Sequence, residues 1–132
     1  MARDPDQTKR KLLDAAILEF AEQGVSGARV DRIAERSGVN KRMIYAYFGN
    51  KEGLFEAVIG HSLENLLDAV PIQTDDLPGY AGQLFDYLIA HPERRRLALW
   101  RLLERPAATP AETRSTKRKV AALTRARPHD AA

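Results

Sequence analysis

The chain has 132 residues and a formal net charge of +3, and it contains no cysteine. This length provides for one domain, or for a small domain with part of another, which excludes multidomain machinery. Disulfides, thiolate metal sites and a cysteine nucleophile are excluded as well. No apolar run approaches the roughly 18 residues of a membrane span, and the first residues, MARDPDQTKRK, are too polar for a signal peptide. We therefore expect a soluble, cytoplasmic protein with no membrane partner.

The positive charge is unevenly distributed along the chain. Residues 1–60 carry ten Lys and Arg against nine Asp and Glu, and residues 61–90 carry none against five. Residues 91–132 carry eleven against four, so the excess lies in the C-terminal third. Bulk charge therefore does not indicate nucleic-acid binding, and such a function has to be argued from the placement of individual basic residues.

The first residues contain the signals of a helix start. Asp4 is predicted to be the N-cap, Pro5 the first helical residue, and Gln7 the partner in an arrangement like a capping box. Apolar residues then recur at helical spacing, namely Leu13, Ala16, Ile17 and Phe20. Gly24 ends this pattern. The basic run at residues 9–11 is compatible with contact to a DNA backbone or with an ordinary solvated helix face, and both interpretations stay open.

Two short helical patterns follow between residues 28 and 51. The break between them has the sequence Ser37-Gly38-Val39-Asn40, and a break this short fits a helix-turn-helix corner. Gly38 is predicted to take the left-handed conformation that ends the first helix. Asn40 is predicted to cap the second helix with its side-chain oxygen.

The second of these helices has two faces on a wheel of about 100° per residue. Ile44 and Phe48 are four residues apart and are predicted to point into the core. The other side chains are Lys41 and Arg42 in the first turn, Ala46 on the outward face with Arg42, and Tyr45 and Tyr47 on the flanks. The first turn of a recognition helix meets base edges in the major groove, so the basic pair is predicted to read bases. A flanking tyrosine can lean on the core while its hydroxyl reaches solvent or a phosphate.

A further helix is predicted to begin directly after this one. The chain turns at Gly49, Asn50 caps the next helix, and Lys51 lies in its first turn. Free backbone amides, the helix dipole and the Lys51 ammonium together predict a clamp for a phosphate.

Several parts of this region carry a family resemblance: Gly24, Val30-Asp31-Arg32-Ile33-Ala34, Ser37-Gly38-Val39, Ile44-Tyr45-Ala46-Tyr47-Phe48 and Lys51. Together they look like the DNA-binding domain of the TetR family of bacterial transcriptional repressors, over roughly residues 5–60. The most specific part is YAYF followed by Lys51. The resemblance implies that Lys41 and Arg42 correspond to base-reading positions. It also implies that Tyr45, Tyr47 and Lys51 correspond to phosphate-contacting positions.

Two positions depart from the family pattern. Arg29 stands where the family usually has a Thr that caps the helix and touches phosphate, and Arg29 is kept here as a candidate contact. Arg42 stands where the family often has Gly, so the preferred base sequence should differ from that of members with Gly. The candidate DNA interface is therefore Arg29, Lys41, Arg42, Tyr45, Ala46, Tyr47 and Lys51.

A long helix is predicted over residues 51–70. Its apolar residues recur at helical spacing, namely Leu54, Phe55, Val58, Ile59, Leu63, Leu66, Leu67 and Val70. This stripe is too broad for a three-helix domain to cover alone, so its upper half is expected to pack against helices from the C-terminal half of the chain. The helix would then be the connector through which the rest of the chain can move the DNA reader.

Residues 71–79 are predicted to form a loop, followed by two helical stripes that stop and restart at His91-Pro92. The stripes consist of Tyr80, Leu84, Phe85, Leu88 and Ile89, then Leu97, Trp100 and Leu103. They are expected to cover the long connecting helix. Phe85, Tyr87 and Trp100 are assigned to core packing, with an effector cavity as the alternative. The arginines at residues 94–96 are predicted to be solvated, with an anion site as the alternative.

Beyond Pro106 the apolar signal fades to a weak, basic helical pattern at residues 112–127. Members of the family usually continue for several more helices, which complete an effector pocket and form most of the homodimer interface. We interpret the C-terminal third as the remnant of a regulatory domain, from either a truncated gene product or an artificially shortened chain. A monomer or a weak dimer is therefore expected.

The sequence thus predicts an all-α protein with four parts. These are a helix-turn-helix DNA-binding domain at 1–50, a connecting helix at 51–70, an incomplete helical regulatory domain at 71–106 and a basic, weakly structured segment at 107–132. The expected function is sequence-specific binding of operator DNA by a transcriptional repressor, with a small-molecule effector left open. The alternative is a truncated interaction module that pairs with a full-length relative or no longer binds DNA productively.

Catalysis finds little support in the sequence. His61, His91 and His129 have no metal-ligand spacing, there is no Gly-rich phosphate loop, and no Ser or Thr has an evident base partner. We therefore expect no enzymatic activity, no metal and no cofactor.

Overall fold

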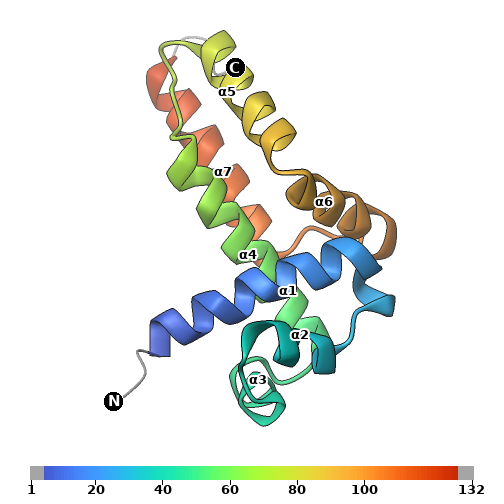
Figure 1. The fold of residues 1–132 in the computed structure, drawn as a ribbon. Coiled ribbons are helices and arrows are strands. Elements are labelled where there is room, and N and C mark those ends of the chain that lie inside the picture. Colours follow the sequence, from blue (N-terminus) through green and yellow to red (C-terminus); the bar gives the residue numbers. More distant parts are fainter. Residues whose placement is uncertain (1–4, 128–132) are drawn as a thin grey trace.

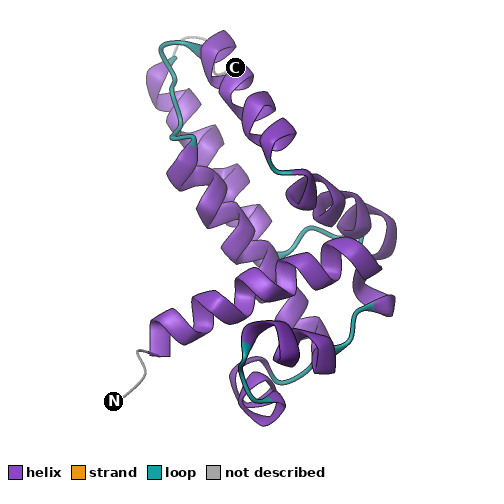
Figure 2. Ribbon diagram, viewed as in Figure 1, coloured by secondary structure: helices purple, strands orange, loops and turns teal. Residues whose placement is uncertain are grey.

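The computed structural model describes residues 5–127, and within that range every regular element is a helix. In chain order these are α1 (Pro5–Gly27), α2 (Val30–Ser37), α3 (Lys41–Phe48), α4 (Lys51–Ala69), α5 (Leu77–Ala90), α6 (Pro92–Glu104) and α7 (Pro110–Ala126), as drawn in Figures 1 and 2. The predicted all-α fold is confirmed. Asp4, the predicted N-cap, and His129 lie outside the described residues. None of the described helices combines the length with the apolar composition that a membrane span requires.

Helix α1 lies across the middle of the molecule (Figure 1). It packs against α2, α4 and α6, while α7 packs against α4 and α5 packs against α6. We call residues 5–59, which contain α1, α2, α3 and the first half of α4, the head. We call residues 60–69 of α4, together with α5 and α7, the outer part. Helix α6 connects the two, because it contacts both α1 and α5.

The main apolar core lies inside the head. Apart from Leu97 of α6, its buried side chains all come from the head: Leu12, Leu13, Ala16, Ile17, Phe20, Val25, Ala28, Val30, Ile33, Val39, Ile44, Leu54, Phe55, Val58 and Ile59. The rings of Phe20 and Phe55 meet edge to face with their centroids 5.2 Å apart. Edge-to-face contact is a favoured geometry for aromatic pairs, so α1 and α4 are joined by specific packing.

Helix α1 is interrupted where the sequence predicts its end. Gly24 has a φ of 73°, and a short helical turn continues from there to Gly27. A Cβ at position 24 would lie 2.8 Å from a ring carbon of Trp100, and the Trp100 indole donates to the Ala21 carbonyl at 3.0 Å. Position 24 therefore needs glycine both for its backbone conformation and for the close approach of α6.

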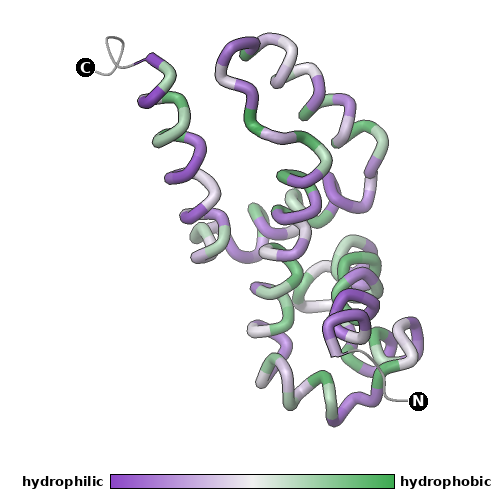
Figure 3. Tube along the Cα trace, turned by 90° about the vertical axis from the view of Figure 1, so that its left-hand side faces the viewer, coloured by the Kyte–Doolittle hydropathy of each residue, from purple (hydrophilic) through white to green (hydrophobic). Residues whose placement is uncertain are grey.

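The prediction that α5 covers the connecting helix is wrong. Phe85 and Ile89 are 64% and 56% exposed, because α5 packs against α6 and α7 takes the place beside α4. Leu103 is 76% exposed. The face of α6 that meets the head consists of Leu97, Trp100 and Glu104, and Leu103 points away from it. Figure 3 shows that the outer helices carry hydrophobic positions among hydrophilic ones.

The arginines at residues 94–96 are only partly solvated, contrary to prediction. The Arg94 side chain is largely buried and donates to the Ser62 hydroxyl at 3.2 Å. Arg95 donates to the carbonyls of Leu88 and Ile89 at the end of α5. Arg96 is exposed as expected. The chain bends at His91-Pro92, and α6 runs on from the end of α5 toward the head (Figure 1). At this bend Arg94 reaches α4 and Arg95 reaches the last carbonyls of α5, so two of the three guanidiniums meet polar groups of neighbouring helices.

The segment expected to be weakly structured contains the regular 17-residue helix α7. Thr109 Oγ1 accepts from the Glu112 amide at 3.2 Å, and Glu112 Oε2 accepts from the Thr109 amide at 2.7 Å. This reciprocal pair is a capping box, with Pro110 at the first helical position. The local signal for the helix start is therefore present in the sequence at residues 109–112. The domain boundaries inferred from the sequence stay predictions.

Candidate nucleic-acid interface

The corner between α2 and α3 forms as predicted from its local residues. Gly38 has a φ of 71°, and its amide donates back to α2. Asn40 Oδ1 accepts from the Arg42 amide at 2.7 Å. Asn50 Oδ1 accepts from the Gly53 amide at the start of α4, also at 2.7 Å. Both asparagine caps satisfy amides that a helix start leaves free, which fixes where α3 and α4 begin.

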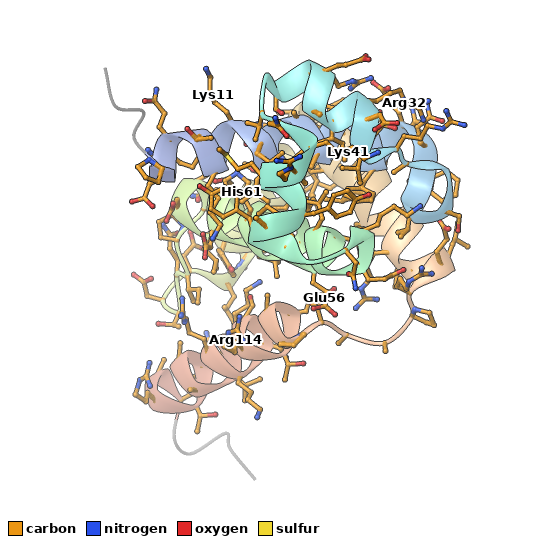
Figure 4. All side chains as sticks on the ribbon, turned by 90° about the horizontal axis from the view of Figure 1, so that it is seen from below. Lys11, Arg32, Lys41, Glu56, His61 and Arg114 are labelled. Carbon is orange, nitrogen blue, oxygen red and sulfur yellow. The ribbon has the colours of Figure 1, made fainter. Side chains whose placement is uncertain are left out.

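Helix α3 presents one buried face and one exposed face. Ile44 is buried and Phe48 is half-buried against the core. The exposed side chains are Lys41, Arg42, Met43, Tyr45, Ala46 and Tyr47. The structure thus brings together five of the predicted interface residues, and it adds Met43. Seen from below, α2 and α3 face the viewer, with Arg32 and Lys41 on that side (Figure 4).

The two basic residues in the first turn of α3 differ in their partners. Lys41 Nζ lies 2.7 Å from Asp31 Oδ1 on α2. The hydrogen bond between them lowers the pKa of Asp31 and raises the pKa of Lys41. The exposed guanidinium of Arg42 has no hydrogen-bond or ion-pair partner among the described residues. Arg42 is therefore available to a ligand without breaking an internal contact, whereas Lys41 has to leave Asp31.

Lys51 begins α4 as predicted, but its ammonium already donates hydrogen bonds within the protein. Its Nζ donates to the carbonyls of Ser26 and Ala28 at 3.2 and 3.3 Å. It is therefore directed at the segment between α1 and α2, and it leaves the free amides of α4 to the Asn50 cap. One of its hydrogens stays available, because an ammonium has three donors.

The basic residues near the start of α1 lie in different surroundings. The Lys9 ammonium lies 5.7 Å from the centroid of the Phe48 ring at the end of α3. Lys11 projects outward from α1 (Figure 4). Lys9 therefore contacts the end of α3.

Arg29 occupies the N-cap position of α2, where its exposed side chain makes no capping hydrogen bond. Its backbone amide donates instead to Glu19 Oε2 of α1 at 3.0 Å. Glu19 is fully buried, and sequence reasoning missed it. A signal exists, since Glu19 follows Ala16 by three residues and so shares the apolar face of α1.

The end of α6 is bonded to the head beside Lys51. The Glu104 carboxylate accepts from the amides of Val25 and Ser26 at 2.8 and 3.1 Å, and from the Ser26 hydroxyl at 2.5 Å. The Ser26 hydrogen bond, with the two amides, lowers the pKa of Glu104 against the effect of burial. Arg105 pairs with Glu52 in the first turn of α4. These contacts lie beyond the reach of sequence patterns, because they join residues far apart along the chain.

A cavity of about 240 Å³ lies between α4, α6 and α7. Its lining consists of Ile59, Ser62, Leu63, Arg94, Leu97, Ala98, Arg101, Leu102 and Glu112. Phe85, Tyr87 and Trp100, the residues considered for an effector cavity, are not part of this lining. Trp100 packs on Gly24, Tyr87 stacks on His91 with ring centroids 4.1 Å apart, and Phe85 is exposed. The assignment of Phe85 to the core is therefore wrong.

The described residues contain no group of three or more His, Asp or Glu side chains placed to hold a metal ion. His61 Nε2 lies 2.9 Å from Asp14 Oδ1, which joins α4 to α1. The same His61 nitrogen lies 3.4 Å from Asn65 Nδ2, so the contact links two helices and involves one carboxylate.

Comparison with known proteins decides the family. A family model described as "Bacterial regulatory proteins, tetR family" matches residues 12–58. A second, described as "Tetracyclin repressor-like, C-terminal domain", matches residues 76–129. The chain belongs to the TetR family. The first of the two matches contains the helix-turn-helix, and the second contains α5, α6 and α7, so the resemblance extends well beyond the DNA-binding motif.

Relatives of this TetR-family chain include named repressors. It is 47% identical over 103 residues to the HTH-type transcriptional repressor SCO4008 of Streptomyces coelicolor, covering 78% of the chain and 54% of that protein. It is 35% identical over 99 residues to the HTH-type transcriptional repressor NicS of Pseudomonas putida, covering 70% of the chain and 47% of that protein. The chain thus spans about half the length of the curated relatives it matches.

Solved structures of related regulators share the fold. The putative transcriptional regulator SCO4942 from Streptomyces coelicolor superposes with a TM-score of 0.76 at 38% identity, covering 93% of this chain and 66% of that one. A TetR-like transcriptional regulator from Rhodococcus sp. RHA1 superposes with a TM-score of 0.73 at 20% identity, covering 98% of this chain and 74% of that one. At that lower identity the likeness supports the fold alone.

Proposed function

We propose that the chain is a sequence-specific DNA-binding transcriptional repressor whose α3 enters the major groove. Membership of the TetR family and the named repressors among its relatives support this proposal. The observation that carries it is that the side chain of Arg42 is exposed and unpaired among the described residues. This guanidinium is exposed in the first turn of α3, on the side opposite Ile44, and has no partner among the described residues.

Arg42 is the proposed base reader. A guanidinium presents two parallel N–H donors that match the O6 and N7 acceptors of guanine in the major groove. The Asn40 cap fixes the start of α3, so the direction in which Arg42 leaves the helix is fixed as well. We assign Lys41 a second base or phosphate contact, made once Asp31 releases it, and Ala46 an apolar contact on the same face.

The remaining contacts go to the DNA backbone. Tyr45 and Tyr47 flank the exposed face of α3 with partly exposed rings, and each hydroxyl can donate to a phosphate. Lys51 and Arg29 lie at the starts of α4 and α2. Phosphate contacts position a reader without identifying bases, so these four residues supply affinity and Arg42 supplies specificity.

A salt series with duplex DNA tests the proposal. Preferred duplexes are first selected from a random pool, and the dissociation constant is then measured as ionic strength rises. A reader with several phosphate contacts loses affinity steeply with salt and still prefers its selected duplex over a scrambled one. Equal affinity for both duplexes at every salt concentration would refute sequence-specific binding and favour the alternative of a helical interaction module.

Two variants separate the roles of the side chains. Selection repeated with Arg42→Gly should yield a different half-site, because the guanine contact is worth about 1 to 3 kcal/mol of discrimination. Recovery of the same half-site would refute Arg42 as the base reader. Lys51→Ala should instead weaken the selected and scrambled duplexes by the same factor, and a loss confined to the selected duplex would refute a phosphate contact.

Assembly is a second part of the proposal. Readers of this type normally bind as two-fold dimers with their recognition helices one helical turn of DNA apart. We propose that this chain is monomeric or weakly dimeric when dilute, with exposed apolar side chains on α5 and α6 available for weak association. Light scattering over a concentration range measures this. A dimer that persists at nanomolar concentration would refute weak association and show that these residues contain a sufficient interface.

A further inference from the structure

One buried charge in the head has no role in the proposed DNA contacts. Glu19 of α1 is 0% exposed, although it lies on the apolar face of the helix. Its Oε2 accepts from the Arg29 amide at 3.0 Å and from Arg32 Nε at 2.8 Å. Its Oε1 has no hydrogen-bond partner, and Arg36 Nε lies 4.0 Å from it.

This arrangement is costly if it serves packing alone. Burying a carboxylate is unfavourable unless the charge is paired and hydrogen-bonded, and one oxygen of Glu19 stays unsatisfied. An apolar side chain of the same size would fill the site without that cost. The presence of a carboxylate at this buried position therefore has to be explained by the hydrogen bonds that Oε2 accepts.

Glu19 Oε2 accepts a hydrogen bond from the backbone amide at the start of α2. Arg29, at the N-cap, has no side-chain acceptor for the free amides. In a capping box the acidic residue three positions further on accepts from the N-cap amide, but here that position is Arg32. The Arg32 guanidinium bonds instead to Glu19, and its Nη2 donates to the Gly27 carbonyl at 3.1 Å. Glu19 thus supplies from α1 the acceptor that α2 lacks.

We propose that Glu19 is a positioning residue that fixes the start and orientation of α2 and, through α2, the recognition helix. Helix α2 packs against α3, and its Asp31 holds Lys41 in the first turn of α3. A shift at the start of α2 is therefore passed to the residues proposed to read bases. This inference rests on the proposed function for its effect on DNA, but its structural part is measured without DNA.

Glu19→Met tests the proposal, because methionine keeps the volume and removes the acceptor. Amide hydrogen exchange without DNA should speed up about tenfold in α2, the factor that corresponds to one charge-assisted hydrogen bond. Exchange in the buried half of α4 should change much less. The matched control is Glu22→Met, which removes the same charge from an exposed site of α1 that pairs with Arg36 in the last turn of α2. Because exposed ion pairs contribute little, this variant should leave exchange at the start of α2 close to wild type.

Two further variants supply rescue. Glu19→Gln keeps one oxygen acceptor and should retain most of the protection of α2. Arg29→Ser places a capping hydroxyl on α2 itself, and in the Glu19→Met background it should restore slow exchange. If Glu19 only filled space in the core, Arg29→Ser would not restore slow exchange in the Glu19→Met background. If Glu19→Met does not fold, Arg32→Gln takes its place, since that side chain is 39% exposed and its loss should loosen α2 in the same selective way.

The DNA arm compares Glu19→Met with Glu22→Met on the selected duplex. We expect a loss of about tenfold for the first variant and less than about twofold for the second. Unchanged exchange in α2, or equal acceleration in α2 and α4, would overturn the positioning role. If α2 loosens while affinity stays unchanged, the link from α2 to the base readers is refuted. Failure of the wild type to bind any duplex would refute the proposed function and leave the exchange result as the test of Glu19.

Discussion

The head and the outer part bury their apolar side chains to very different extents. Apart from Leu97 of α6, every member of the main core belongs to the head. Beyond the head, the described residues leave many large apolar side chains exposed: Phe85, Leu88, Ile89, Leu99, Leu102, Leu103, Val120 and Leu123. Within the head the exposed ones are Leu18 and three on α3, namely Met43, Tyr45 and Tyr47. The head is therefore packed as a unit, and most of the apolar surface it exposes lies on its proposed DNA face.

The closer packing of the head affects how firmly α3 is oriented. The proposed contact with DNA requires α3 to be held at a fixed angle, and the core shared by α1, α2, α3 and α4 provides that rigidity. The outer part is held by fewer contacts, of which the salt bridge from Arg101 to Glu112 at 2.7 Å is one. Helix α6 belongs functionally to the head, because Leu97, Trp100 and Glu104 all face α1. Movement of the outer part can reach the head chiefly through α4 and α6.

The largest expected effect comes from emptying the core of the head. Phe20→Ala should lower the free energy of unfolding by about 4 kcal/mol, since it leaves a cavity against Phe55. The matched change in the outer part, Phe85→Ala, should stay within about 0.5 kcal/mol because that side chain is mostly exposed. Urea denaturation measures both. Equal losses would show that α5 is covered in solution and that the two regions do not differ as described.

A smaller effect is expected at the joint between the head and α6. Gly24→Ala combines a positive φ with a clash against Trp100 and Glu104, and it should cost about 3 kcal/mol. Gly82→Ala in α5 has open space around its Cβ and should stabilise the protein by about 0.5 to 1 kcal/mol. Thermal unfolding of both variants shows whether each substitution raises or lowers the stability of the protein. A neutral Gly24→Ala would refute the close docking of α6.

The same joint should respond to acid. The folded pKa of Glu104 is lowered from the usual 4.5, so its contribution is complete above that pH and is lost as pH falls through the lowered pKa. The fluorescence of Trp100, the single tryptophan, reports on the joint. The Trp100 fluorescence of the wild type should change as the pH falls below about 4.5. The Glu104→Gln variant should not show this change. Identical acid titrations of the two proteins would contradict the role of Glu104.

The smallest expected effect concerns Lys41. Asp31→Asn removes its partner and should tighten binding to any duplex by roughly twofold at low salt, because exposed ion pairs are weak. Glu35→Gln removes the same charge from α2 without touching Lys41, and it should have a smaller effect. Fluorescence anisotropy at matched ionic strength compares them. If both variants bind equally, the gain comes from overall charge and not from releasing Lys41.

The sequence predicts those features of the head that depend on neighbouring residues. Gly38, Asn40 and Asn50 act within a few positions of themselves, so their turn and caps can be inferred from local patterns alone. The exposed face of α3 follows from the 3.6-residue helical period, which places Arg42 opposite Ile44. Residues 30–59 can therefore be assigned to helices, caps and faces from the amino-acid sequence.

The rest depends on contacts that local patterns do not encode. The apolar stripe of α5 predicts that a face is buried but not which helix buries it, and the core assignment of Phe85 fails for this reason. The bonds from Glu19 to Arg29 and from Glu104 to Ser26 join separate helices, as do those of Lys51 to carbonyls before α2. In each case the residue type is visible in the sequence, and its partner is set by the way the helices pack.

The proposed function requires the chain to bind DNA through the head, with α3 at the centre of the contact. Hydrogen exchange measured with and without the selected duplex tests this most directly, because it locates the contact along the chain. Slower exchange is expected at residues 40–53, with unchanged exchange in α5 and α7. Protection confined to α5 or α7, with α3 unchanged, would contradict it.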